Sequence, residues 1–279
     1  MTGHDYIKQL MADKNIDQKQ IAVVTGGNKG LGFETCRQLM MRGLYVVLTA
    51  RDQAKAKKAA EMLDPSASSV TWAVLDVTDA ASIAAFAGQV KKNWGRADVL
   101  VNNAGIAIYD KLDEASARAT VDTNFFGPLR VTDALVPSMH RGSRIVMVSS
   151  AMGQLSCLSG ALRDQFESPA LSREQLIDLM QDFVRFAGGS TAAQRGWPAS
   201  AYSVSKAGLN MLTRILSKEL APRGIAVNAV HPGWVRTDMG GPSAPLDTTT
   251  GARSIVWAAV ISGNVPTGGF FHDGKTMQW

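Results

Sequence analysis

The sequence predicts an α/β fold in which a doubly wound parallel sheet carries helices on both faces. Short apolar, β-branched runs such as 21–25 and 45–49 are typical of parallel strands that are buried on both sides. A glycine-rich segment, 26–32, joins the first run to a helical pattern at 33–41, so that a strand, a glycine loop and a helix follow one another directly. With 46% hydrophobic residues, the chain can bury one large core, and we expect a single domain over residues 1–279.

The glycine loop is suited to the pyrophosphate of a dinucleotide. Glycine lets the backbone approach a phosphate closely, and the N-terminus of a helix offers free N–H groups and positive potential. The spacing is G-x-x-x-G-x-G, not the G-x-G-x-x-G of the broader class, and a tight turn without a ligand is the alternative. The predicted cofactor contacts in this loop are Gly26, Asn28, Lys29, Gly30, Leu31 and Gly32.

The residue after the second strand indicates which cofactor binds. An acidic side chain usually binds a ribose 2′-hydroxyl there, whereas a 2′-phosphate requires a cation. Arg51 occupies this position, the acid comes one residue later at Asp52, and Lys29 lies in the glycine loop. Arg51 and Lys29 can bind a phosphate together, which favours NADP(H) over NAD(H), although each could also be a solvated surface cation.

Two further predicted strands end in polar residues at the same edge of the sheet. Strand 70–75 is followed by Asp76, which could accept a hydrogen bond from an adenine amino group or cap the next helix. Strand 98–101 is followed by Asn-Asn-Ala-Gly at 102–105, which could also be a simple turn. Because ligands bind at the carboxyl edge of such a sheet, the predicted cofactor contacts here are Asp76, Val77, Asn103, Ala104 and Gly105.

Tyr202 and Lys206 are four residues apart, which places both side chains on one face of a helix. A nearby ammonium stabilises negative charge on the phenol, so we expect the pKa of Tyr202 to fall below its ordinary value of roughly 10. Such a tyrosine can give a proton to a carbonyl oxygen or take one from an alcohol near neutral pH. The pair alone is weak evidence, because an aromatic ring often simply rests on a lysine stem.

In this order along the chain, the motifs resemble those of the short-chain dehydrogenase/reductase family. The matching pieces are Thr25-Gly26-x-x-x-Gly30-x-Gly32, Asn102-Asn103-Ala104-Gly105, Asn124, Ser150, Tyr202-x-x-x-Lys206 and Pro232-Gly233. The resemblance implies a Rossmann-type sheet of seven strands and binding of NADP(H). It also implies that the nicotinamide contacts include Tyr202, Lys206, Pro232, Gly233, Val235 and Thr237.

The resemblance also assigns the catalytic roles. Tyr202 would be the general acid in reduction, and Lys206 would lower its pKa and hold the nicotinamide ribose. Ser150, rather than Ser149, would donate a hydrogen bond to the substrate oxygen. Asn124 would order a water molecule that links Lys206 to solvent.

The chain is most similar to one subgroup, the monomeric NADPH-dependent carbonyl reductases of animals and related plant ketone reductases. A long insert at 151–200 separates Ser150 from Tyr202, and within it Ser172 is a suitable N-cap for apolar residues at helical spacing up to Val184. In oligomeric relatives the helix with the tyrosine and lysine packs against another subunit. The resemblance implies that the insert covers that face and leaves a monomer; a surface addition without effect on assembly is the alternative.

The expected reaction is NADPH-dependent reduction of a ketone, aldehyde or quinone to the alcohol. We expect an apolar pocket with an aromatic wall, formed by Ile106, Met152, Trp234 and Met239, although each residue could belong to the core. The alternatives are a secondary-alcohol dehydrogenase, a ketone reductase dedicated to one natural product, and an NADP-binding regulatory protein without turnover.

Composition excludes several other classes. The net charge is only +5, and no long basic tract with interleaved aromatic residues suggests nucleic-acid binding. No apolar stretch approaches the about 18 residues of a membrane span, and His231 has no second ligand at metal-binding spacing. Two cysteines, Cys36 and Cys157, fit a reducing compartment, and residues 1–20 lack the features of a signal, so we expect a cytoplasmic protein with a short N-terminal extension.

Overall fold

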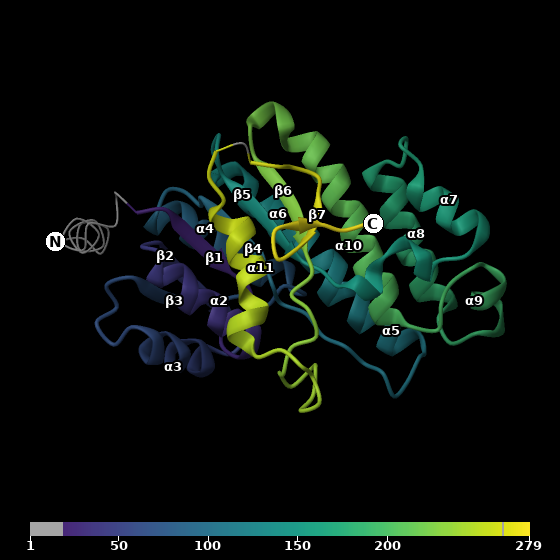
Figure 1. Cartoon of the computed structure of the whole chain (residues 1–279), viewed down its shortest axis with the longest axis horizontal. Helices are drawn as coiled ribbons and strands as arrows, with labels where there is room; N and C mark the ends of the chain where they lie inside the picture. Colours follow the sequence, from purple (N-terminus) through teal and green to yellow (C-terminus); the bar gives the residue numbers. More distant parts are fainter. Residues whose placement is uncertain (1–18, 264) are drawn as a thin grey trace.

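The computed structural model describes residues 19–263 and 265–279, and these contain one sheet with helices on both faces (Figure 1). The predicted N-terminal extension lies outside the described residues except for its last two positions. The strands are β1 (Ile21–Val24), β2 (Tyr45–Ala50), β3 (Val70–Val74), β4 (Val99–Asn102), β5 (Arg144–Val148), β6 (Ala226–Val230), β7 (Phe270–His272) and β8 (Lys275–Thr276). The helices of the main body are α2 (Gly30–Met41), α3 (Gln53–Leu63), α4 (Ala80–Asn93), α5 (Glu114–Val121), α6 (Gly127–Leu135), α10 (Ala201–Leu220) and α11 (Thr248–Val260).

The strand order confirms the doubly wound topology. The strands follow the order β3-β2-β1-β4-β5-β6-β7-β8, and all neighbours up to β7 are parallel. The chain moves outward from β1 to β3 and then returns to the other side of β1 to form β4. The loops after β1 and β4 therefore separate at the carboxyl edge, where this class of fold binds its ligands.

The predicted count of seven strands is wrong by one. β8 pairs antiparallel with β7 and closes the sheet with only two residues. The turn between them is Asp273-Gly274, whose φ angles of 47° and 73° suit a two-residue hairpin. A strand this short carries no alternating pattern from which it could have been predicted.

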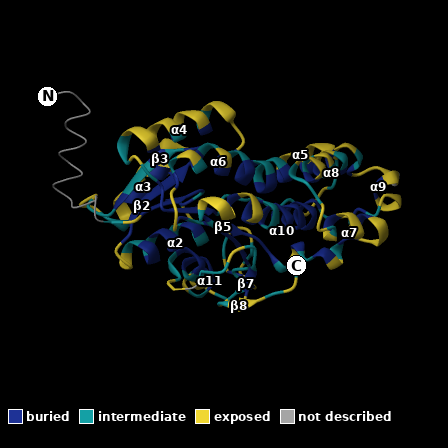
Figure 2. Ribbon diagram, turned by 90° about the horizontal axis from the view of Figure 1, so that it is seen from above, coloured by how far each residue is buried: buried dark blue, intermediate teal, exposed yellow. Residues whose placement is uncertain are grey.

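The residues of β1 alternate between two hydrophobic cores. Ile21 and Val23 belong to a core that includes residues of α4, α6 and α10, while Ala22 and Val24 belong to one that includes residues of α2, α3 and α11. Side chains of a strand alternate between the two faces of a sheet, so a strand that is covered on both faces is apolar throughout. Figure 2 shows the buried sheet between layers of helices whose outer faces are exposed.

The insert forms α7 (Gly160–Glu167), α8 (Arg173–Phe186) and α9 (Ser190–Gln194), which gather at one end of the molecule beside α5 and α10 (Figure 1). Ser172 caps α8 as predicted, because its Oγ accepts a hydrogen bond from the backbone N of Gln175 at 3.2 Å. The Gln175 side chain returns a hydrogen bond by accepting from the backbone N of Ser172 at 2.9 Å.

Helix α8 packs directly on α10. Met180 and Phe183 on its inner face are fully buried, together with most of the predicted apolar stripe. Gly208 of α10 permits this approach, because a Cβ there would lie 2.6 Å from the Met180 Sδ.

In the described part of the chain, no helix combines the length and apolar character that a membrane crossing requires.

Candidate active site

A cavity of about 1130 Å³ opens at the carboxyl edge of the sheet, at the switch point between β1 and β4. Every residue predicted to contact the cofactor or the substrate lines this cavity. Three of the four predicted catalytic residues, Ser150, Tyr202 and Lys206, line it as well. Asn124 lies behind the wall, where it contacts Ile106.

The glycine loop has the geometry of a phosphate-binding turn. Gly30 has a φ of +53°, which favours glycine, and a side chain on Gly32 would collide with the carbonyl oxygen of Gly26. Helix α2 begins at Gly30, and the side chain of its N-cap residue, Lys29, makes no capping hydrogen bond. Among the described residues, no side chain caps the first N–H groups of α2, which fit a pyrophosphate.

Thr25 joins the two loops that form the floor of the cavity, a role that the sequence did not reveal. Its Oγ1 accepts hydrogen bonds from the backbone N atoms of Asn103 and Ala104, both at 2.9 Å. The Asn103 Nδ2 donates in return to the Thr25 carbonyl oxygen at 2.8 Å and to that of Gly26 at 3.2 Å. The Asn103 side-chain amide thus helps to hold the backbone of the glycine loop in its conformation.

The side chains around the end of β2 favour a phosphorylated ribose. Arg51 is exposed and, within the described residues, forms no ion pair or hydrogen bond; its charge acts on Asp76 only at a distance, so its guanidinium can bind a phosphate. Lys29 forms an exposed ion pair with Asp238, with 2.5 Å between Nζ and Oδ2, and would share its charge between two anions. Asp52 caps α3 by accepting from the backbone N of Lys55 at 2.9 Å, so this acid is already engaged.

Asp76 is held in a turn at the far end of the cavity. Its Oδ1 accepts from the backbone N of Thr78 at 2.9 Å and from the Thr78 hydroxyl at 2.7 Å, and these bonds hold the pKa of Asp76 below its usual range. The alternative that Asp76 caps the next helix is wrong, because Asp79 caps α4 by accepting from the backbone N of Ala81.

Tyr202 and Lys206 lie in the first two turns of α10 and share a face, as predicted. Ser200 caps this helix by accepting from the backbone N of Ser203 at 3.1 Å, which sets the start of the helix just before Tyr202. The Lys206 Nζ lies 5.6 Å from the centroid of the Tyr202 ring and donates to the Val148 carbonyl oxygen at 2.7 Å. Both side chains are almost fully buried.

The expected fall in the pKa of Tyr202 is wrong in this structure. Burial raises the pKa to about 12, and the hydrogen bond with Ser150 offsets only part of that rise. Burial also lowers the pKa of Lys206 to about 8. Because the ammonium lies over the ring and is bound to a carbonyl, it does not compensate for the loss of water around the phenol. Tyr202 therefore keeps its proton at neutral pH, as a proton donor must.

The two serines at the end of β5 differ in their surroundings. The Ser149 hydroxyl donates to the Asn210 Oδ1 at 2.6 Å inside the protein. Both serines border the cavity, and it is the Ser150 side chain that forms a hydrogen bond with Tyr202. The geometry favours Ser150 as the group that contacts a substrate.

Asn124 lies in a π-helix (Asp122–Phe126) between α5 and α6, a feature often found at functional sites. Its Nδ2 donates to the Ile106 carbonyl oxygen at 2.8 Å, and its Oδ1 accepts from the Ile106 N at 2.9 Å. A Cβ on Gly105 would lie 3.3 Å from the Asn124 Oδ1 and 3.8 Å from the Lys206 Nζ. Asn124 and Lys206 thus flank Gly105; the ordering of a water molecule by Asn124 stays a prediction.

Large apolar side chains surround the mouth of the cavity. Met152, Trp234 and Met239 line it and are 47%, 57% and 41% exposed, as expected of pocket residues rather than core residues. Tyr109 lines the same mouth and is 63% exposed. No sequence pattern indicated Tyr109, because it lies in an irregular loop without a motif.

A model of the short chain dehydrogenase family matches residues 20–161, and a model described as enoyl-(acyl carrier protein) reductase matches residues 184–255. The chain belongs to the short-chain dehydrogenase family. Carbonyl reductase [NADPH] 1 of Bos taurus is 39% identical over 272 residues, covering 93% of this chain and 98% of the relative. The protein of the same name from Homo sapiens is 38% identical with the same coverage.

Solved structures of this family agree with the fold. Salutaridine reductase from Papaver somniferum has a TM-score of 0.84 at 33% identity, covering 91% of this chain and all of that one. NADPH-bound carbonyl reductase from chicken fatty liver has a TM-score of 0.71 at 26% identity, covering 94% of each chain.

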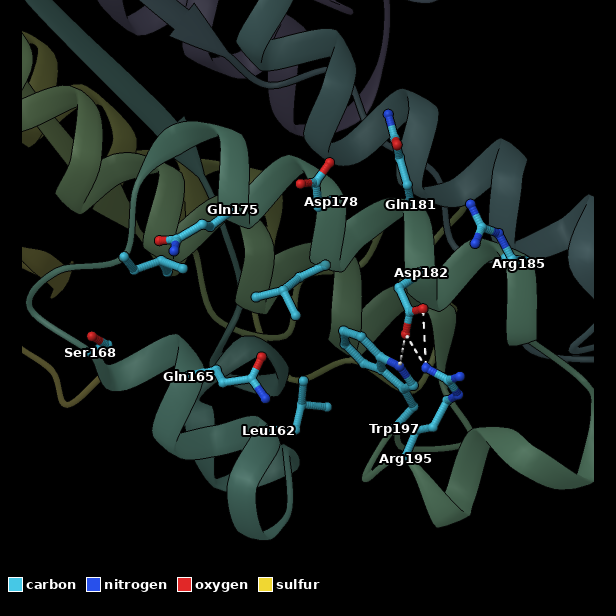
Figure 3. Close-up of a pocket in the computed structure, with 12 residues that line it drawn as sticks. Leu162, Gln165, Ser168, Gln175, Asp178, Gln181, Asp182, Arg185, Arg195 and Trp197 are labelled. Atoms are coloured by element: carbon cyan, nitrogen blue, oxygen red, sulfur yellow. Dashed lines mark hydrogen bonds and ion pairs between the residues drawn. The ribbon is translucent and has the colours of Figure 1, made fainter.

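The insert contains a second cavity of about 740 Å³ between α7 and α8 (Figure 3). Its most prominent charged group, Asp182, accepts hydrogen bonds from Arg195 at 3.2 Å and from the Trp197 Nε1 at 3.4 Å. The carboxylate is therefore already paired, and none of the predicted catalytic residues lines this cavity. The residues predicted to bind the cofactor and the substrate line the first cavity instead.

Proposed function

We propose that this short-chain dehydrogenase uses NADPH to reduce the carbonyl group of a ketone, aldehyde or quinone to an alcohol. The observation that carries the proposal is the meeting of Tyr202, Lys206 and Ser150 in one cavity with a glycine loop suited to a pyrophosphate. The relatives named carbonyl reductase [NADPH] support both the reaction and the cofactor.

NADPH, when bound, supplies the hydride. Tyr202 gives its proton to the carbonyl oxygen, since burial keeps the phenol protonated. Ser150 donates a hydrogen bond to the same oxygen and stabilises the negative charge that develops there, an effect worth about 10²- to 10³-fold in rate when a single donor is removed. Lys206 places a positive charge beside the phenol as it loses its proton.

The preference for NADPH rests on Arg51. Its guanidinium forms no hydrogen bond or ion pair in the described structure, whereas the neighbouring acid, Asp52, is used as a helix cap. A guanidinium suits a 2′-phosphate because it can donate two parallel hydrogen bonds. Lys29 adds a second cation, but its ion pair with Asp238 weakens its attraction for the phosphate.

The proposed assembly is a monomer, and the proposed location is the cytoplasm. Helix α8 packs on α10, with the buried Met180 against Gly208, which leaves less of α10 for a second subunit. Light scattering of the purified protein tests the monomer.

The two free cysteines, Cys36 and Cys157, are not set up for redox chemistry. Cys36 is fully buried, and burial raises the pKa of the half-buried Cys157 to about 11.

A ketone reductase dedicated to one natural product is the second candidate. It is favoured by the likeness to salutaridine reductase, whose TM-score of 0.84 exceeds the 0.71 of the chicken carbonyl reductase. The two candidates differ in breadth of substrate rather than in chemistry.

One assay tests the function and separates these candidates. The loss of NADPH absorbance is followed on mixing the protein with quinones, aromatic ketones, aliphatic ketones and aldehydes, with NADH in parallel. Consumption of NADPH with several classes, and little of NADH, supports a broad carbonyl reductase. Activity on one ketone alone supports the dedicated enzyme, and activity confined to small charged keto acids would overturn the apolar pocket.

A further inference from the structure

Tyr109 is a large aromatic residue that lies mostly outside the hydrophobic core. It lies in the loop between β4 and α5, 63% exposed, with its ring centroid 6.0 Å from that of Tyr202. Within the described residues its hydroxyl has no hydrogen-bond partner, and burial of one side of the ring raises its pKa. Single exposed apolar residues are common on protein surfaces, but an exposed apolar ring beside a reactive group indicates a surface that binds a ligand.

The loop that carries Tyr109 is anchored on both sides. On one side, Ile106 exchanges two backbone hydrogen bonds with the side chain of Asn124, at 2.9 and 2.8 Å. On the other side, Asp113 caps α5 by accepting from the backbone N of Ser116 at 2.8 Å. Tyr109 is thus presented between two fixed points.

The insert supplies part of the second anchor. Gly188, just after α8, has a φ of +78°, and a Cβ there would lie 2.6 Å from the Leu112 carbonyl oxygen and 2.9 Å from the Asp113 Cα. The backbone of the insert therefore lies directly against the Tyr109 loop. Leu112 also packs against the same core as the inner face of α8.

A second ring at the mouth is held more tightly. The Trp234 Nε1 donates to the Gly240 carbonyl oxygen at 2.8 Å, which fixes the orientation of the indole. Trp234 and Tyr109 line the same cavity as Tyr202. A substrate whose carbonyl oxygen reaches the Tyr202 hydroxyl therefore places its substituents in a cavity whose lining includes both rings.

We propose that Tyr109 is a specificity-determining residue that favours substrates with an aromatic group next to the carbonyl, and that Gly188 of the insert positions it. Aromatic pairs gain energy beyond the burial of area, which an aliphatic substituent of the same reach does not. The inference rests on the proposed carbonyl reduction and adds that the insert contributes to the choice of substrate.

The test compares an aryl ketone with a small aliphatic aldehyde in wild type, Tyr109→Ala and Tyr109→Phe. Tyr109→Ala should lower kcat/KM for the aryl ketone roughly 2- to 10-fold, mostly through KM, and leave the aldehyde unchanged. Tyr109→Phe should retain the wild-type preference because it keeps the ring. Met62→Ala, which removes an equally exposed side chain from α3 outside the cavity, is the matched control.

Gly188→Ala tests the second part without removing the ring. The added methyl group must displace the Leu112–Asp113 backbone, so this variant should show the same selective loss as Tyr109→Ala, with NADPH binding measured by fluorescence unchanged. The double variant should lose no more than Tyr109→Ala alone.

The inference is overturned if Tyr109→Ala changes both substrates equally or neither, or if Tyr109→Phe loses as much as Tyr109→Ala. A Gly188→Ala protein with a normal thermal unfolding profile and a wild-type preference would overturn the role of the insert. Wild type without turnover on any carbonyl would instead refute the proposed function on which the inference rests.

Discussion

Lys206 is buried without a carboxylate partner in the described structure, and this placement carries a cost in stability. Burial lowers its pKa from 10.5 to about 8. A base whose pKa is lower in the folded than in the unfolded state destabilises the fold, because the unfolded chain binds the proton more tightly. The penalty is fully present below about pH 8 and disappears as the pH rises toward 10.5, where both states become neutral. At roughly 1.4 kcal/mol per pKa unit, its full size is about 3 kcal/mol.

Lys206→Met removes the charge while it keeps an unbranched side chain. It also removes the hydrogen bond to the Val148 carbonyl oxygen, a loss of about 1–3 kcal/mol that does not depend on pH. The unfolding free energies of wild type and variant are therefore compared at several pH values. The part of their difference that changes with pH is the contribution of the Lys206 charge. Between pH 7 and pH 10, wild type should gain about 2 kcal/mol relative to Lys206→Met.

Urea denaturation followed by tryptophan fluorescence at a series of pH values measures this difference. Lys218→Met is the control, because Lys218 is an exposed lysine on the same helix and its removal should give no comparable pH-dependent difference. If wild type and Lys206→Met differed by the same free energy at pH 7 and at pH 10, the reasoning about the buried ammonium would be refuted.

Three other predictions follow from single contacts. Arg51→Ala should raise the Kd of NADPH about 10-fold or more and leave that of NADH nearly unchanged in fluorescence titrations, because only NADPH carries the phosphate. Phe183→Ala should lower the unfolding free energy by about 3–5 kcal/mol in urea, since the ring is fully buried and packs with its centroid 5.2 Å from that of the Trp197 ring. Ser149→Ala should cost about 1–3 kcal/mol in stability, because the buried Asn210 Oδ1 loses the hydroxyl that donates to it. Ser150→Ala should instead lower kcat about 10²-fold with little effect on stability. Equal effects of the two serine variants on kcat would contradict the assignment.

The sequence predicted best those features that depend on local patterns. The strand, glycine loop and helix at 21–41, the Ser172 cap of α8 and the shared face of Tyr202 and Lys206 all follow from spacing along a few turns. The topology followed because continuous apolar runs indicate strands that are covered on both faces.

Features that depend on distant contacts could not be predicted. The ion pair between Lys29 and Asp238 joins residues 209 positions apart, and no pattern indicates it. The pKa of Tyr202 depends on burial by the whole fold, so the spacing to Lys206 predicted the wrong direction. Tyr109 reaches the site only because both ends of an irregular loop are anchored by residues from other segments.

Tyr202→Phe is the sharpest test of Tyr202 as the proton donor, because it removes one hydroxyl and keeps the ring in its place on α10. NADPH binding, measured by fluorescence titration, should be unchanged, and the rate of NADPH consumption with a carbonyl that wild type reduces should fall by about 10²- to 10⁴-fold. A variant that binds NADPH normally and retains the full rate would contradict the account, because a group other than Tyr202 would then supply the proton.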